Sequence, residues 1–235
     1  YHNPFVLPAL HRFGYEKSFV SKHDDSSFES HSADQIVDYT NLVVSTGFAT
    51  IPKNTSIDLG GCGKGYLADK LGKIISKYKI DGFWFSIGGD IIARGNNESN
   101  TSWQLTIQDA DKPTTALDGV TQFENIGFCV ATSGTIVRRG KVGATNWHHI
   151  INPLTYKPAE TDVRLATVLA PTTVEADVLA TTAVILGSEK CLDFMKNSSA
   201  ISALLQLDDI NKTIIGFGEL YENYNVAKNI QMVGV

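Results

Sequence analysis

The chain has 235 residues, of which 43% are hydrophobic and 19% are charged, and its formal net charge is −5 at pH 7. This composition is typical of a globular protein with a sizeable core. The negative charge argues against a nucleic-acid-binding surface, which normally carries a basic excess, and no apolar run is long enough for a transmembrane helix. The three cysteines are scattered without a Cys-x-x-Cys pair, which argues against a disulfide framework or a zinc site.

The first part of the chain is predicted to be irregular over residues 1–35 and to form a hairpin from strands at 38–45 and 48–51. A short strand at 55–59 is expected to lead into a helix at 66–79. Apolar residues recur at helical spacing in that helix and lysines occupy its other side, which predicts an amphipathic helix packed through one face. The apolar positions are Leu67, Leu71, Ile74, Ile75 and Tyr78.

The rest of the chain is expected to form mainly strands, with a reversal or bulge at Gly88-Gly89. The expected strands are 83–87, 91–94, 103–108, 127–132, 163–170, 201–207 and 213–217. Helices are predicted at 174–186, which is almost entirely apolar and therefore buried, and at 189–196. Strands outnumber helices and do not alternate with them regularly. This pattern predicts a single α+β domain over residues 1–235, with mixed or antiparallel sheets and a few packed helices.

A glycine-rich stretch at 58–69 lies between an extended segment and the first long helix, and it contains Lys64. Glycines let backbone amides approach a ligand closely, and amides at a helix N-terminus favour phosphate. The stretch does not match the P-loop pattern, because Gly65 follows the lysine where Ser or Thr is required. It fits the dinucleotide-binding fingerprint only loosely. A turn that merely packs the helix against its strand is the structural alternative.

The buried helix contains Asp177 one turn from its start, with Thr181 four residues later on the same face. A buried carboxylate must be paired, protonated or bound to a cation. A favourable interaction with the helix dipole is the alternative explanation. A carboxylate, a hydroxyl and a loop carbonyl are the hard oxygen ligands that Mg²⁺ prefers beside phosphates, so we favour a metal site. Thr172 and Glu175 have the spacing of a capping box, which gives Glu175 a structural role.

Taken in order, the motifs resemble the FAD:protein FMN transferase (ApbE) family over about residues 1–205. The resemblance rests on Asp58-Leu-Gly-Gly-Cys-Gly-Lys-Gly-Tyr-Leu-Ala-Asp69, Ser86-Ile-Gly-Gly-Asp90, Thr132-Ser-Gly134, His149-Ile-Ile-Asn-Pro153, Ala170-Pro-Thr, Glu175-Ala-Asp177 and Thr181. It implies an ApbE-like fold and transfer of FMN from FAD to a Thr or Ser hydroxyl of an acceptor protein, with release of AMP. The opening Tyr1-His-Asn-Pro-Phe resembles a flavin-contacting segment of the family. Because the chain starts there without Met or a signal peptide, we expect that an N-terminal portion of the family pattern is missing.

The resemblance also implies the residues of the site. Mg²⁺ would be bound by the carbonyl of Gly63 together with Asp177 and Thr181, and His149 and Asp177 would be catalytic. Contacts with FAD are implied for Asn3, Gly60, Lys64, Tyr66, Gly88, Gly89, Asp90, Ser133, Gly134, His149 and Ile151. Family members are often exported or membrane-anchored, which leaves the compartment of this chain open.

This sequence departs from the family pattern at several motif positions. Asn152 and Asn3 replace acidic residues, and Gly63 replaces an alanine but still offers its carbonyl. Two other functions therefore stay open beside the transferase. One is a Mg²⁺-dependent FAD pyrophosphatase, in which water replaces the acceptor hydroxyl, and the other is a flavin-binding module without catalysis.

Overall fold

The computed structural model describes residues 3–13, 15, 36–117, 123–125, 127–142 and 145–227. Two compact units form, one from Tyr1–Leu59 with Thr135–Glu160 and the other from Gly60–Gly134 with Thr161–Val235. Each unit is described by itself below. The prediction of one domain over residues 1–235 stays a prediction.

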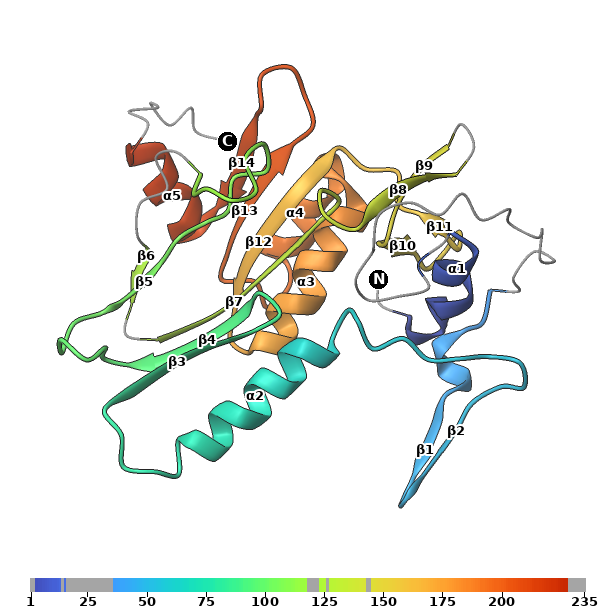
Figure 1. The fold of residues 1–235 in the computed structure, drawn as a ribbon, viewed down its shortest axis with the longest axis horizontal. Helices are drawn as coiled ribbons and strands as arrows, with labels where there is room; N and C mark the ends of the chain where they lie inside the picture. The colour runs from blue at the N-terminus through green and yellow to red at the C-terminus, as the bar shows by residue number, and fades with distance from the viewer. Residues whose placement is uncertain are drawn as a thin grey trace. The chain divides into compact units, whose positions relative to one another are not determined.

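The second unit is built on a six-stranded sheet with the order β14-β13-β12-β7-β4-β3 (Figure 1). Every neighbouring pair in this sheet is antiparallel. Its strands are β3 (Gly82–Ile87), β4 (Asp90–Gly95), β7 (Gly127–Gly134), β12 (Val163–Ala170), β13 (Ser202–Leu207) and β14 (Ile214–Phe217). A further antiparallel pair joins β5 (Trp103–Leu105) to β6 (Phe123–Asn125). The predicted α+β class with antiparallel strands is confirmed.

Successive residues of each strand point to opposite faces of the sheet, so they pack against different elements. Ala93 and Phe128 belong to a core cluster that includes Leu220 of α5 (Gly218–Ala227), whereas the adjacent Ile92 and Cys129 cluster with Ala68 of α2 (Gly63–Ile75). The apolar helix α3 (Thr173–Leu186) packs on β7 and β12 and against α2, and α4 (Ser188–Lys196) follows it (Figure 1). None of the described helices is long and apolar enough to cross a membrane.

The face of α2 that is buried is not the one that the apolar pattern predicts. Gly65, Ala68 and Gly72 are buried, whereas Leu67, Leu71, Ile74 and Tyr78 are 48%, 37%, 49% and 69% exposed. A β-carbon at residue 65 would lie 2.6 Å from the carbonyl oxygen of Thr173, so the glycine permits a close approach to α3. The prediction that the apolar stripe forms the packing face is therefore wrong, because small residues bring the α2 backbone against its neighbours.

Several predicted boundaries also change. The hairpin is confirmed as β1 (Val43–Ser45) and β2 (Phe48–Thr50), but a 3₁₀ turn, η2 (Tyr39–Asn41), replaces the start of the first predicted strand. The predicted strand at 55–59 is absent, although these residues are described. Gly88 and Gly89, with φ of 59° and 101°, make the tight reversal between β3 and β4.

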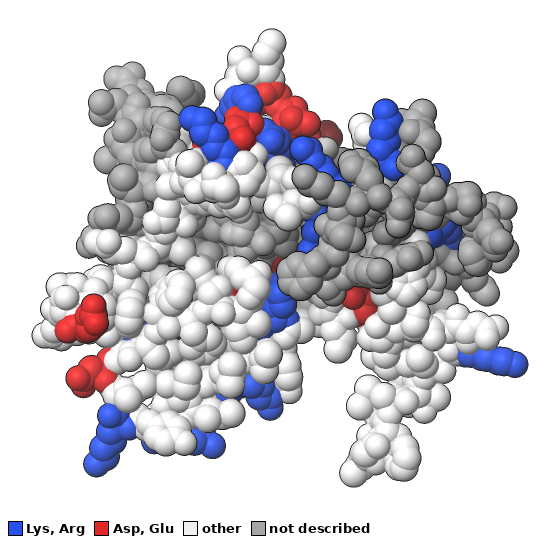
Figure 2. Space-filling model, viewed as in Figure 1, with Lys and Arg blue, Asp and Glu red and all other residues white. Residues whose placement is uncertain are grey.

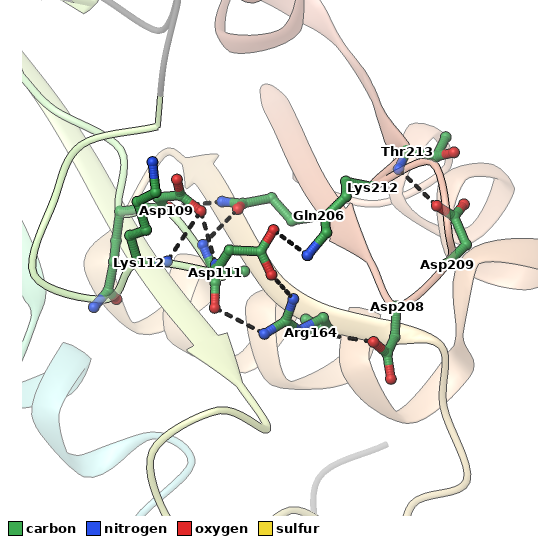
Figure 3. Close-up of polar contacts among 11 residues, drawn as sticks. Asp109, Asp111, Lys112, Arg164, Gln206, Asp208, Asp209, Lys212 and Thr213 are labelled. Atoms are coloured by element: carbon green, nitrogen blue, oxygen red, sulfur yellow. Dashed lines mark hydrogen bonds and ion pairs between the residues drawn. The ribbon is translucent and has the colours of Figure 1, made fainter.

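Residues 108–111, beyond β5, are held in place by the side chains of Gln206, Arg164 and Lys212 (Figure 3). Gln206 is 5% exposed; its Oε1 accepts from the N–H of Ala110 at 2.8 Å and its Nε2 donates to the carbonyl of Gln108 at 2.7 Å. Arg164 donates to the carbonyl of Ala110 at 2.9 Å and pairs with Asp111. In Figure 2, acidic and basic side chains lie next to one another over the end of the sheet where β13 joins β14. The charged side chains of this cluster therefore have a structural role: they hold residues 108–111 in place.

The described part of the first unit has small sheets, short 3₁₀ turns and one α-helix. It contains η1 (Pro4–Val6), α1 (Leu7–Arg12), the β1–β2 hairpin, and the antiparallel pairs β8 (Arg139–Val142) with β9 (Thr145–His148) and β10 (Ile151–Asn152) with β11 (Lys157–Pro158). Its core cluster consists of Ala9, Leu10, Ile151 and Tyr156. The helix at Leu7–Arg12 corrects the prediction of an irregular segment. Pro8 is compatible with it because a proline in the first turn loses no intrahelical hydrogen bond. Residues 16–35 lie outside the described part of the chain.

Candidate functional site

The N-terminus of α3 sets the position of Asp177. Thr172 is the N-cap residue: its Oγ1 accepts from the N–H of Glu175 at 3.3 Å and donates to Oε2 of Glu175 at 2.6 Å. The predicted capping role of Glu175 is confirmed. This start places Asp177 in the buried first turns of the helix, where it is 1% exposed.

Lys64 joins the carboxylates of Asp90 and Asp177. Its Nζ lies 2.5 Å from Oδ2 of Asp90 and 3.1 Å from Oδ1 of Asp177. The residues come from α2, the first position of β4, and α3, and both aspartates are buried, each 1% exposed as a whole residue. The second oxygen of Asp177 accepts from the N–H of Gly65 at 3.4 Å. The structure therefore brings three of the predicted site residues into one buried ion-paired cluster.

The charges in this cluster perturb one another. Burial, followed by the negative charge of Asp177, raises the pKa of Asp90 to about 7, although Lys64 acts in the opposite direction. Burial alone would lower the pKa of Lys64, but the two carboxylates outweigh it and raise that pKa above its usual value. Two buried carboxylates beside one ammonium group leave an excess of negative charge, which is the environment that a cation favours.

Asp69 is a site-supporting residue that the motif-based reasoning did not single out. Its Oδ1 accepts from the N–H of Thr173 at 2.9 Å and its Oδ2 from the N–H of Val174 at 3.0 Å. These N–H groups lie in the first turn of α3, where the helix itself offers no acceptor. Asp69 of α2 thus caps α3, while Gly65 of α2 holds Asp177 of α3. The signal in the sequence was an aspartate one turn after Gly65 in a predicted helix.

The turn at Gly88-Gly89 adjoins the cluster. A β-carbon at residue 88 would lie 2.9 Å from Cδ of Lys64, so the glycine leaves room for the lysine side chain. The N–H of Gly89 donates to Oγ of Ser86 at 3.2 Å. Oγ of Ser133 on β7 lies 2.9 Å from Oγ1 of Thr181 on α3, so these two hydroxyls form a hydrogen bond between the strand and the helix.

The other predicted residues of the second unit lie around the start of α2 or in the sheet. Gly60 is exposed, and Tyr66 is 56% exposed with the ammonium of Lys70 5.4 Å from its ring centroid. Gly63 is the first residue of α2, and a helical carbonyl keeps a second lone pair for another partner. At Gly134 a β-carbon would lie 2.3 Å from the carbonyl oxygen of Arg164, so the glycine permits close packing of β7 on β12.

Asn3, Ile151 and His149 are the predicted site residues that belong to the first unit. Asn3 accepts from the N–H of Phe5 at 3.0 Å and donates to the carbonyl of Val37 at 2.8 Å, which ties η1 to a distant segment. Ile151 is 6% exposed within the core of this unit. These contacts give both residues structural roles.

His149 lies in a cluster of aromatic and basic side chains. Its ring stacks on Tyr15 with centroids 6.1 Å apart, and its Nδ1 lies 3.3 Å from the carbonyl oxygen of Arg138. The side chain of Arg138 also contacts Tyr15: its Nη1 donates to the tyrosine hydroxyl at 3.0 Å. Nδ1 of His149 therefore has a backbone partner within the unit.

The residues of the second unit fit a magnesium ion. The described residues contain no group of three or more His, Cys, Asp or Glu side chains that could hold a metal by themselves. Mg²⁺, however, is usually bound by one or two carboxylates, with its other positions filled by water and substrate phosphates. Asp177, the hydroxyl of Thr181 one helical turn later and the excess negative charge supply such a set, and the ammonium of Lys64 lies where a cation is attracted.

Comparison with known proteins identifies the family. The model of the ApbE family matches residues 2–205. The chain is 29% identical over 188 residues to an FAD:protein FMN transferase of Klebsiella pneumoniae, covering 78% of this chain and 53% of that protein. It is 31% identical over 159 residues to the enzyme of that name from Escherichia coli K12, covering 67% of this chain and 44% of that protein. This chain thus spans about half the length of these curated relatives.

Solved structures support the fold. The crystal structure of an ApbE protein from Thermotoga maritima superposes with a TM-score of 0.76 at 24% identity, covering 94% of this chain and 71% of that one. A flavin transferase ApbE from Vibrio cholerae superposes with a TM-score of 0.66 at 20% identity, covering 94% and 69%. The match of the family model over most of the sequence shows that the chain belongs to the ApbE family.

Proposed function

We propose that this chain is an FAD:protein FMN transferase that depends on Mg²⁺. The observation that carries the proposal is the buried cluster of Lys64, Asp90 and Asp177 at the N-terminus of α2, in a chain of the ApbE family. The curated relatives are named for transfer of FMN from FAD to protein. The acceptor is a Thr or Ser hydroxyl of another protein.

The reaction exchanges a phosphoanhydride bond of FAD for a phosphate ester bond to the acceptor. The acceptor oxygen forms a bond to the FMN-side phosphorus, the pyrophosphate P–O bond breaks, and AMP leaves with the bridging oxygen. Asp177 and Thr181, with the carbonyl of Gly63, would hold Mg²⁺. When bound, the ion neutralises negative charge on the pyrophosphate oxygens, as in other phosphoryl transfers.

The chain's own groups bind and orient the substrate in this proposal. The first N–H groups of α2 and the ammonium of Lys64 form a positive region for the pyrophosphate. His149 is proposed to accept the proton of the acceptor hydroxyl. By family resemblance, the remaining contacts with FAD are assigned to Asn3, Gly60, Tyr66, Gly88, Gly89, Asp90, Ser133, Gly134 and Ile151.

The test uses the full chain with FAD, Mg²⁺ and an acceptor domain, followed by mass spectrometry of the acceptor. We expect an added FMN mass with the unchanged protein and with Asp193→Ala, which removes an exposed carboxylate from α4. We expect none with Asp177→Ala, because the buried carboxylate is lost. Modification at the normal rate by Asp177→Ala would overturn the proposal.

A parallel reaction without acceptor separates the alternatives. Release of free FMN and AMP at the same rate with and without acceptor, and no modified protein, would indicate a pyrophosphatase. Binding of FAD without any turnover would indicate a flavin-binding module.

A further inference from the structure

We propose that Lys64 is a displaceable counter-cation: its ammonium group is shared by Asp90 and Asp177 until a divalent cation binds Asp177, and binding of that cation releases Lys64 from Asp177. The inference rests on the metal site of the proposed function. It adds that the metal and the Lys64–Asp177 ion pair exclude each other.

The burial of the two carboxylates shows why a counter-cation is needed. The side chains of Asp90 and Asp177 are 1% and 2% exposed, and both contact the same ammonium group. Buried charges without a partner are strongly destabilising. Lys64 therefore stabilises the fold in the absence of metal by partly neutralising two carboxylates that would otherwise repel each other.

The position of the ammonium group opposes binding of a metal to the same oxygen. Nζ of Lys64 lies 3.1 Å from Oδ1 of Asp177. A Mg²⁺ ion bound to that oxygen would lie about 2.1 Å from it, and therefore at most about 5 Å from the ammonium group. Two cations at this separation in a poorly solvated site repel strongly. This repulsion favours release of the ammonium group when the divalent cation binds.

The surroundings of Lys64 allow it to leave while the carboxylate stays in place. Its side chain is 34% exposed, so its end can reach solvent by rotation. Asp177 remains oriented by the N–H of Gly65, which donates to its other oxygen, Oδ2, at 3.4 Å. Lys64 follows Gly63 at the start of α2, so the released ammonium group stays beside a helix N-terminus. Metal binding thus leaves the ammonium group of Lys64 with Asp90 as its remaining carboxylate partner, at a helix end where anions are favoured.

Isothermal titration with Mg²⁺ alone tests the exchange, using the full chain, Lys64→Met and the control Lys70→Met. Lys70 is exposed on the same helix, and its ammonium group faces the ring of Tyr66. We expect Lys64→Met to bind Mg²⁺ at least about tenfold more tightly than the unchanged protein, because the competing charge is gone. Lys70→Met should bind like the unchanged protein. Without metal, Lys64→Met should unfold at a lower temperature, and Mg²⁺ should restore much of the loss.

Equal or weaker Mg²⁺ binding by Lys64→Met overturns the inference and leaves the metal site of the proposed function intact if the unchanged protein binds. If neither protein binds Mg²⁺, the inference and the metal dependence of the proposed function both fail. Binding by Lys64→Met alone supports the inference and shows that Lys64 blocks the site.

Acetylation of the unchanged protein supplies a measurement that does not depend on a variant's folding. The protein is treated briefly with an amine-reactive acetyl ester, with and without Mg²⁺, and each lysine is quantified by peptide mass spectrometry. We expect the labelling of Lys64 to rise several-fold with Mg²⁺ while Lys70 and Lys73 stay constant. Unchanged labelling of Lys64 at a Mg²⁺ concentration that saturates the site overturns the inference.

Discussion

The carboxylate of Asp69 on α2 caps the helix that begins at Thr173, by accepting the N–H groups of Thr173 and Val174 at 2.9 and 3.0 Å. In return, the N–H of Gly65 on α2 donates to Asp177 of α3. The two helices therefore hold each other's N-terminal turns, and the candidate metal ligand Asp177 lies where they meet.

Removal of this cap should destabilise the fold. Asp69→Ala leaves two backbone N–H groups of α3 without their acceptor, and we expect a loss of about 1–2 kcal/mol in the free energy of unfolding. Urea denaturation followed by circular dichroism measures it. Asp193→Ala, which changes an exposed carboxylate on α4, should have little effect. Equal losses in the two variants would contradict the role of Asp69.

The close approach of α2 to α3 should not tolerate a methyl group. Gly65→Ala places a β-carbon 2.6 Å from the carbonyl oxygen of Thr173 and from Cα of Val174, so the helices must separate. We expect a loss of about 1–3 kcal/mol by overpacking. Leu67→Ala on the same helix removes a 48% exposed side chain and should change stability far less. Thermal denaturation compares the two, and a Leu67→Ala variant less stable than Gly65→Ala would show that the apolar stripe is the packing face.

The tie between Gln206 and residues 108–110 should contribute to the stability of the second unit. Gln206→Leu keeps the size of the side chain but leaves the N–H of Ala110 and the carbonyl of Gln108 without their partner. Each buried group left unpaired costs about 1–3 kcal/mol. Urea denaturation should show the loss, and hydrogen exchange should show faster exchange at Ala110. The control is Ile210→Ala, a 95% exposed position beyond β13, which should leave both measurements unchanged.

His148 should make the free energy of unfolding depend on pH. Burial lowers its pKa below the ordinary value of 6.5, although its bond with the carbonyl of Ala159 acts in the opposite direction. Its Nδ1 accepts from the N–H of Ile150 at 3.3 Å, so Nε2 carries the proton and donates to Ala159. The unfolded chain binds a proton more readily, so this contribution is complete above pH 6.5 and is lost as the pH falls through the pKa of the folded state.

Denaturation at a series of pH values checks this sign. We expect His148→Gln, which keeps a donor toward Ala159, to lose less stability than the unchanged protein as the pH falls below 6.5. His11→Gln, an exposed position in α1, should follow the unchanged protein. A His148→Gln curve parallel to that of the unchanged protein would contradict the assignment.

Several features follow from the sequence alone because they depend on neighbours a few residues apart. The capping box at Thr172 and Glu175, the buried Asp177 one turn later, and the reversals at Gly47 and Gly88-Gly89 are all local patterns. Alternation along the strands and the apolar helix after Thr172 also predicted the α+β class correctly. Ordered motifs along the chain indicated the family.

Only the tertiary structure decided how Lys64 and Asp69 are used. Lys64 finds Asp90 and Asp177 at separations of 26 and 113 residues, and Asp69 finds Thr173 at a separation of 104. The same holds for α2, whose apolar stripe predicted the wrong buried face. Hydrophobic periodicity shows which face of a helix is apolar, whereas glycines decide how closely two helix backbones can approach. Here that close approach brings the helix ends together and assembles the cluster around Asp177.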